Sequence, residues 1–175
     1  MPCSSDDLFK WAPVASAVFA AIAAGISAIN VWLQNRNASK NRSLDMLVKK
    51  EAEFEGPRMR EIRRLAAKAL KSGETESQAI DDLLDFMESV GMLVASESLD
   101  ENQAWSSFYH CFANYGHACK SIIASEQAKD ATIWQDCSAL LTRLDAVQMK
   151  RSRLARRFSQ PEVEKFLSQE EKAGV

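Results

Sequence analysis

Glycine and proline are scarce in this chain of 175 residues, with six and four copies. No stretch rich in glycine, serine or proline forms a linker, so long helices joined by short turns are the expected organisation. Apolar residues recur with helical spacing, and no useful length of sequence alternates with the period of two that typifies a strand. The predicted fold class is therefore all-α, without a sheet.

An excess of charge of one sign is also lacking, since 22 lysines and arginines face 24 acidic residues. A net charge of −2 gives no general attraction to nucleic acid, which is an unlikely partner. The four cysteines are irregularly spaced and form no CxxC pair. This spacing does not predict a disulfide framework, and reduced thiols in a cytosolic domain are the simplest interpretation.

Catalytic motifs are missing as well: the sequence has no Walker A, GxGxxG, GxSxG, HExxH or kinase signature. The nearest approach to a metal site is the group His110, Cys111, His117 and Cys119. On one helix these spacings place the histidines opposite the predicted core and do not bring four ligands together. We predict no catalytic residue, no metal site and no cofactor, and a protein that is not an enzyme.

One long segment contains no charge at all, from Trp11 to Asn35. At a rise of about 1.5 Å per residue, it is long enough to cross a hydrocarbon layer of about 30 Å. Trp11 and Trp32 lie near its ends, where indole rings prefer the membrane interface. We predict an extracytoplasmic N-terminus over residues 1–10 and a transmembrane helix over 11–35. Because the segment is rich in alanine, a helix buried in a soluble protein remains the alternative.

Basic residues predict the orientation of this helix. Its N-terminal side carries Lys10, whereas Arg36, Lys40, Arg42, Lys49 and Lys50 follow it. Positive charge stays inside, so the N-terminus is expected outside and the C-terminal domain in the cytoplasm. Membrane lipid is then a partner of the chain.

The transmembrane helix also has a polar and small stripe at 100° per residue. Its members are Ser16, Ala20, Ala23, Ser27, Asn30 and Gln34. Small residues allow another helix to approach closely, and serine or asparagine can hydrogen-bond across the contact. Self-association into a homo-oligomer is therefore expected, with a monomeric anchor and a pore lined by the stripe as alternatives.

After the span we predict a juxtamembrane helix over residues 36–56 and a cytoplasmic helical domain over 57–172. This domain is expected to be a bundle of about four to five helices, at 57–71, 75–96, 100–125, 130–154 and from Ser159 onward. Gly56-Pro57 and Ser72-Gly73 separate the first of these helices from its neighbours. The expected core contains Trp105, Phe108, Phe112, Tyr115, Leu141 and Leu144.

Charged side chains gather on faces of these helices. The acidic face Asp81, Asp82, Asp85 and Glu88 is interpreted as a solvated or interaction surface. Two basic runs are Arg58, Arg60, Arg63, Arg64, Lys68 and Lys71, and Lys150, Arg151, Arg153, Arg156 and Arg157. Helix-dipole compensation with salt bridges explains them most simply. Contact with anionic lipid is the second interpretation and contact with nucleic acid, which the near-neutral total charge disfavours, is the third. The second run is also a candidate contact for a protein partner.

Several segments resemble a family of uncharacterised bacterial proteins, which have one N-terminal membrane helix and a helical domain of unknown function. They are 41–45 (NRSLD), 83–94 (LLDFMESVGMLV), Leu99-Asp100 and Trp105–Phe108. The resemblance covers about residues 11–165, although Tyr115-Gly116 stands where the family has an aromatic pair. It implies the bacterial inner membrane and a helical architecture, and supplies no activity. Some members are associated with phage defence.

Three hypotheses for function follow. The first is a membrane-tethered, non-enzymatic interaction or scaffold module that self-associates through its membrane helix. The second is an oligomeric membrane effector or pore, related to phage defence, in which Ser16, Ser27, Asn30 and Gln34 line a passage. The third is a soluble helical protein in which the alanine-rich helix is buried.

Overall fold

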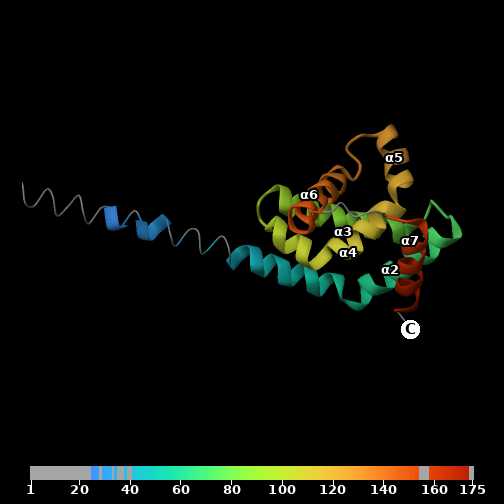
Figure 1. The fold of residues 1–175 in the computed structure, drawn as a ribbon, viewed down its shortest axis with the longest axis horizontal. Coiled ribbons are helices and arrows are strands. Elements are labelled where there is room, and N and C mark those ends of the chain that lie inside the picture. Colours follow the sequence, from blue (N-terminus) through green and yellow to red (C-terminus); the bar gives the residue numbers. More distant parts are fainter. Residues whose placement is uncertain are drawn as a thin grey trace, which may run out of the picture. The chain divides into compact units, whose positions relative to one another are not determined.

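A computed structural model describes residues 25–27, 29–32, 34, 38, 41–153 and 158–173. The chain divides into two units, Met1–Asn41 and Arg42–Val175. The described part of the first unit is helical and exposed. In the second unit, a helical stretch over residues 42–54 precedes the labelled helices (Figure 1). These are α2 (Pro57–Ser72), α3 (Gln78–Ala95), α4 (Glu101–Ala118), α5 (Lys120–Lys129), α6 (Gln135–Ser152) and α7 (Gln160–Lys172).

The described residues contain no strand, so the all-α prediction is confirmed. Local signals placed several boundaries correctly. Pro57 stands in the first turn of α2, and Gly73 ends that helix with a φ of 76°, a left-handed conformation that glycine adopts without strain. At α7, Ser159 and Glu162 form the expected capping box.

The structure also corrects the expected helices. The helix expected over 100–125 breaks at Cys119 into α4 and the ten-residue α5. Asp130 does not start α6, because its carboxylate accepts hydrogen bonds from Thr132 within a turn and α6 begins at Gln135. The bundle therefore has six labelled helices from Pro57 onward, where about four to five were expected.

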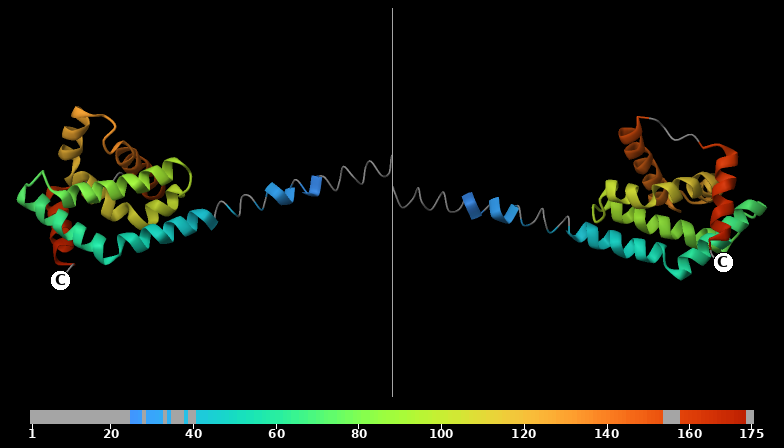
Figure 2. Two further views of the ribbon diagram at one scale, coloured as in Figure 1. Left: turned by 180° about the vertical axis from the view of Figure 1, so that it is seen from behind. Right: turned by 60° about the horizontal axis from the view of Figure 1, so that its bottom comes forward.

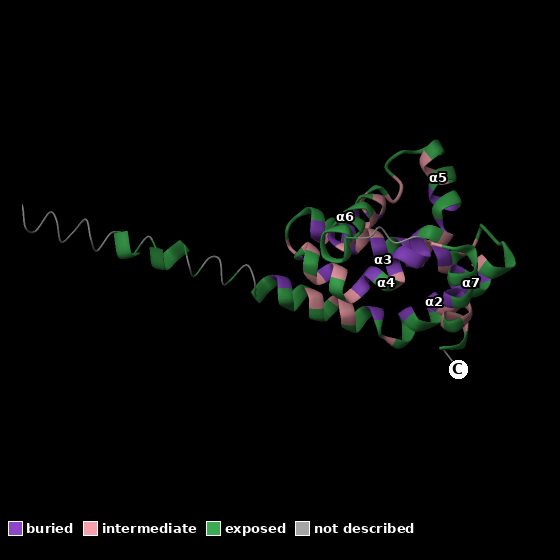
Figure 3. Cartoon of the chain, viewed as in Figure 1, coloured by how far each residue is buried: buried purple, intermediate pink, exposed green. Residues whose placement is uncertain are grey.

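The core of the second unit lies between α2, α3, α4, α6 and α7. α3 packs against α2 and α6, α4 packs against α6, and α7 packs against α2 (Figure 2). Buried positions line the faces that these helices turn to one another (Figure 3). Of the expected core residues, Phe108, Phe112, Tyr115 and Leu144 are buried, whereas Trp105 and Leu141 are half-buried against the core.

Contacts among four phenylalanine rings hold the helical stretch 42–54 against the rest of the second unit. The Phe54 ring stacks on Phe86 of α3 with centroids 5.4 Å apart, and it meets Phe108 and Phe112 of α4 edge-on at 5.6 Å and 5.8 Å. Such offset and edge-on pairs stabilise a core beyond the area they bury. The predicted juxtamembrane helix thus contributes to the core of the domain that follows it.

Within the part of the chain that the structure describes, no helix combines the length and the apolar character needed to cross a membrane. Most of the predicted span 11–35 lies outside the described residues, which include only 25–27, 29–32 and 34 of it. The transmembrane helix and the extracytoplasmic segment 1–10 remain predictions.

Candidate functional site

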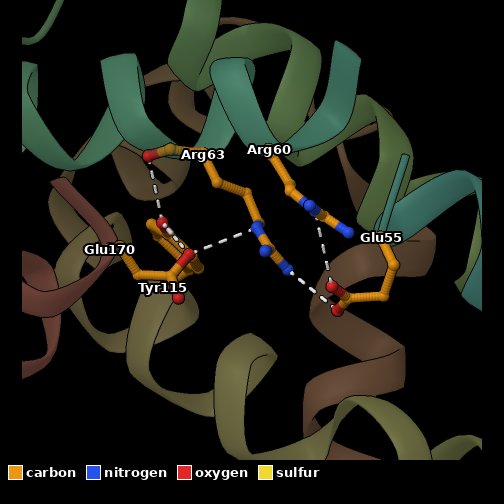
Figure 4. Close-up of polar contacts among 5 residues, drawn as sticks. All are labelled: Glu55, Arg60, Arg63, Tyr115 and Glu170. Carbon is orange, nitrogen blue, oxygen red and sulfur yellow. Dashed lines mark hydrogen bonds and ion pairs between the residues drawn. The ribbon is translucent and has the colours of Figure 1, made fainter. Parts of the chain in front are cut away.

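The most heavily buried charge in the described residues is Arg63 of α2, whose side chain is 9% exposed. Its Nε atom lies 3.2 Å from Oε2 of Glu170 in α7, and its Nη1 atom lies 3.4 Å from Oε1 of Glu55 (Figure 4). The Nε–H does not point along the line to Glu170, so this contact is an ion pair without hydrogen-bond geometry. The guanidinium also covers the Phe54 ring at 4.2 Å, a favourable cation–π distance.

Tyr115 of α4 joins the same cluster. Its hydroxyl lies 3.1 Å from the Arg63 carbonyl oxygen and 3.1 Å from Oε2 of Glu170, and one hydrogen serves both acceptors. Burial raises the pKa of Tyr115, and the Glu170 carboxylate raises it further. The phenol therefore keeps its proton and remains a donor. We interpret this cluster of buried polar contacts as one that stabilises the packing of α7 against α2 and α4.

Most of the basic run on α2 is engaged with acidic partners. Arg64 contacts Glu61 at 2.6 Å and Lys71 contacts Glu171 of α7 at 2.6 Å, while Arg60 lies 3.9 Å from Glu55. The hydrogen bond from Arg64 lowers the pKa of Glu61, and the hydrogen bond from Lys71 lowers the pKa of Glu171. These contacts are the salt bridges expected of this run.

The acidic face of α3 is only partly a solvent-facing surface. Asp85 accepts a hydrogen bond from Nε1 of Trp134 at 2.9 Å. Glu88 accepts one from the main-chain N–H of Asp136 at 3.1 Å and another from that of Cys137. Since these N–H groups belong to the first turn of α6, Glu88 caps a helix that begins far along the chain.

The other two acidic residues of this face, Asp81 and Asp82, are half-buried. Partial burial raises the pKa of Asp81, and the neighbouring Asp85 carboxylate adds to the effect. Two of the four carboxylates of this face, Asp85 and Glu88, make contacts between α3 and the start of α6.

The two histidines face aromatic side chains near the C-terminus. His110 meets the Phe166 ring of α7 edge-on at 5.7 Å, and His117 stacks on Phe158 at 4.9 Å. Both histidines are exposed, whereas Cys119 is buried. Among the described residues, no group of three or more histidine, cysteine, aspartate and glutamate side chains is arranged to hold a metal ion.

Of the second basic run, Lys150, Arg151 and Arg153 are described and exposed, and Arg156 and Arg157 lie outside the described residues. The Arg151 guanidinium lies 4.3 Å from the centre of the Trp105 ring, which covers part of the arginine's charge. Contact of this cluster with lipid or a partner remains a prediction.

The structure describes three of the six residues of the polar and small stripe. Ser27, Asn30 and Gln34 are helical and exposed, whereas Ser16, Ala20 and Ala23 lie outside the described residues. The apolar side chains of the same stretch are exposed too: Ile26, Ile29, Val31 and Trp32 are each 56% to 60% accessible. Four large apolar side chains within seven residues are unusual on a surface that faces only water.

These features define an all-helical protein whose buried polar groups join helices to one another. A family model described as a domain of unknown function (DUF4760) matches residues 15–144, and the chain belongs to this family. The predicted resemblance to an uncharacterised family is confirmed, and the membrane helix that was expected with it is not shown. No curated protein and no solved structure gives a match. Glu170 and α7 lie beyond the matched region.

Proposed function

We propose that this protein is a membrane-tethered, non-enzymatic helical interaction module of the bacterial inner membrane. The tether is the uncharged segment 11–35, the N-terminus lies outside, and the helical domain lies in the cytoplasm. The observation that carries the proposal is the exposure of Ile26, Ile29, Val31 and Trp32 within this segment. An apolar helix surface of this kind needs a lipid or a protein partner.

The polar side chains of the helical domain support a non-enzymatic role. Arg63, Glu88 and Asp85 are engaged in holding helices together. Glu88 does lie beside the buried Cys137, but burial and the Glu88 carboxylate raise the pKa of that thiol to about 12, so it keeps its proton and is a poor nucleophile. Catalysis requires a reactive group next to a base or an electrophile, and this arrangement favours recognition through surfaces instead.

Self-association through the stripe Ser16, Ala20, Ala23, Ser27, Asn30 and Gln34 is the second part of the proposal. Exposed Ser27, Asn30 and Gln34 offer hydrogen-bonding groups along one side of the helix. The same exposure favours a membrane segment over an alanine-rich helix buried in a soluble protein. It also keeps the pore as a second candidate, because a polar stripe in an oligomer can line a passage.

Membrane association is tested first, with the full chain expressed in bacteria. The protein is expected to stay in the membrane pellet after alkaline carbonate treatment and to leave it only with detergent. The variant Ile22→Arg/Ile26→Arg places two charges near the centre of the span, at a cost of about 3 kcal/mol each, and should shift protein to the supernatant. Its matched control is Ile22→Leu/Ile26→Leu. Recovery of the unaltered chain in the high-speed supernatant without detergent would contradict the tether.

Self-association is tested by cross-linking in native membranes. Asn30→Leu should weaken the cross-linked oligomer, whereas Ile29→Leu, off the stripe, should leave it unchanged. Flux of a small ion through liposomes that contain the full chain separates the module from the pore. Flux that Asn30→Leu abolishes would support the pore, and absence of flux at every protein loading would exclude it.

A further inference from the structure

The short helix α5 is largely exposed. It follows the break at Cys119 and projects from the body of the unit in both orientations (Figures 1 and 2). Of its ten residues only Ile122 and Ile123 are buried. Side chains of α4, α5 and α6 line a common space.

This space is a pocket of about 550 Å³ between α4, α5 and α6. Its apolar wall includes Ile123, Leu141 and Phe158, and its polar rim includes His117, Lys120 and Asp145. Volumes of this order hold a small organic molecule, and a mostly apolar wall with a few polar groups is typical of such sites. Phe158 is held flat against His117 at the edge of the pocket.

The polar groups of the rim differ in what they already contact. Asp145 accepts a hydrogen bond from the Tyr109 hydroxyl at 2.9 Å, and the Thr142 hydroxyl donates to the Ser138 carbonyl oxygen at 3.0 Å. Among the described residues, by contrast, Lys120 has no ion-pair partner within 4.0 Å. Within the described part of the chain, the pocket thus offers a lysine ammonium group without a close ion-pair partner beside an apolar wall.

We propose that this pocket binds a small amphipathic carboxylate. The apolar body of the ligand lies against Ile123, Leu141 and Phe158, and its carboxylate pairs with the Lys120 ammonium group. The His117 ring, at the same rim, donates an N–H to the second carboxylate oxygen. Lys120 is the charged group of the rim that is left to pair with a ligand, because the Asp145 carboxylate already accepts a hydrogen bond from the Tyr109 hydroxyl. The site belongs to the helical domain and does not depend on the membrane tether.

The test is isothermal titration calorimetry of the purified full chain with three probes of one shape. They are 4-phenylbutyrate, the neutral 4-phenylbutan-1-ol and the cationic 4-phenylbutylamine. The carboxylate should bind, the alcohol should bind about fivefold to tenfold more weakly, and the amine should give no heat of binding. Equal binding of the carboxylate and the alcohol would overturn the role of Lys120. Absence of binding by the carboxylate at millimolar concentration would overturn the site.

Two pairs of variants locate the binding. Ala124 lines the pocket and is exposed, so Ala124→Trp should fill the space and abolish binding of the carboxylate without disturbing the core. Ala128→Trp is its control, since residue 128 is exposed on the same helix and does not line the pocket. Lys120→Gln should weaken the carboxylate about fivefold and leave the alcohol unchanged, whereas the exposed Lys165→Gln should change neither. Binding that survives Ala124→Trp would place the ligand elsewhere and overturn the proposal.

Discussion

Gly91 of α3 lies directly against the main-chain carbonyl of Asp136 in the first turn of α6. A Cβ atom at residue 91 would overlap the Asp136 oxygen and its carbonyl carbon. One turn earlier on the same helix, Glu88 accepts hydrogen bonds from the N–H groups of Asp136 and Cys137. α3 can therefore approach α6 closely because Gly91 has no side chain, and the adjacent Glu88 caps the N-terminus of α6 at the same contact.

This contact predicts that Gly91→Ala destabilises the domain. The added methyl group meets main-chain atoms, which cannot move without shifting α6, and overpacking of this kind costs about 1–3 kcal/mol. We expect a loss in that range, measured by urea unfolding followed by circular dichroism.

Gly116→Ala is the control for Gly91→Ala. A Cβ atom at residue 116 would also overlap its neighbour, but that neighbour is the end of the Leu141 side chain. A leucine side chain can change rotamer, so the loss should be clearly smaller. An equal or larger loss in Gly116→Ala would contradict the explanation from backbone contact.

The capping of α6 by Glu88 predicts that substitutions at Glu88 lower the free energy of unfolding by graded amounts. Glu88→Ala removes both acceptors and should lower the free energy of unfolding by about 1 kcal/mol, the usual effect of losing a helix cap. Glu88→Gln keeps one carbonyl oxygen and should lose less. Asp82→Ala, on the same helix, removes only a hydrogen bond from the Gln78 side chain and should be nearly neutral. If Glu88→Ala were also neutral, the capping role would be wrong.

The sequence predicted the elements whose signals are local. Pro57 and Gly73 limit α2, and Ser159 with Glu162 starts α7, because each feature acts within a few residues. The break at Cys119 has no such signal. Neither glycine nor proline stands at residue 119, and the apolar spacing of α4 continues into α5, so the pattern alone predicts one helix.

The buried polar contacts were beyond sequence reasoning for a different reason. Arg63 stands in a run of basic residues, and its burial depends on Glu170 and Tyr115, which lie far along the chain. In the sequence, Glu88 likewise looks like a further residue of the acidic face, and nothing there indicates that it caps α6. The local hint was Gly91, three residues later, because a small residue on a helix face often marks a close contact.

The Arg63 cluster predicts strong coupling between α2 and α7. Arg63→Met leaves Glu170 without its cation in a place where it is 14% exposed, and breaking such a pair costs about 3–5 kcal/mol. The double variant Arg63→Met/Glu170→Gln should lose less than the sum of the two single variants. Chemical denaturation of the four proteins measures the difference.

The exposed pair Arg64 and Glu61 is the matched control for this cycle, since both lie on α2 and contact each other at 2.6 Å. Its double-variant cycle should show little coupling, because water screens surface ion pairs. Additive effects at Arg63 and Glu170 would show that the buried contact does not couple the helices.

Alkaline pH is expected to weaken the fold. Burial raises the pKa of the Cys119 thiol to about 12 and that of Cys137 to about 12, and burial also raises the pKa of Tyr115. Below the ordinary pKa values of 9.0 for cysteine and 10.0 for tyrosine, folded and unfolded chains hold the same protons. Above them the unfolded chain releases its protons first, so stability falls as pH rises, by about 1.4 kcal/mol per pH unit for each residue that titrates.

Tyr115→Phe isolates one part of this effect. At pH 8 the variant should be less stable than the unaltered chain by about 1 kcal/mol, because it loses the hydrogen bonds to Arg63 and Glu170. Above pH 10 that difference should shrink and then reverse, since phenylalanine has no proton to lose when the chain unfolds. Urea unfolding of both proteins between pH 8 and pH 11 gives the comparison. A difference that stays constant across this range would mean that Tyr115 titrates alike in the folded and unfolded chains, and that burial does not hold its proton.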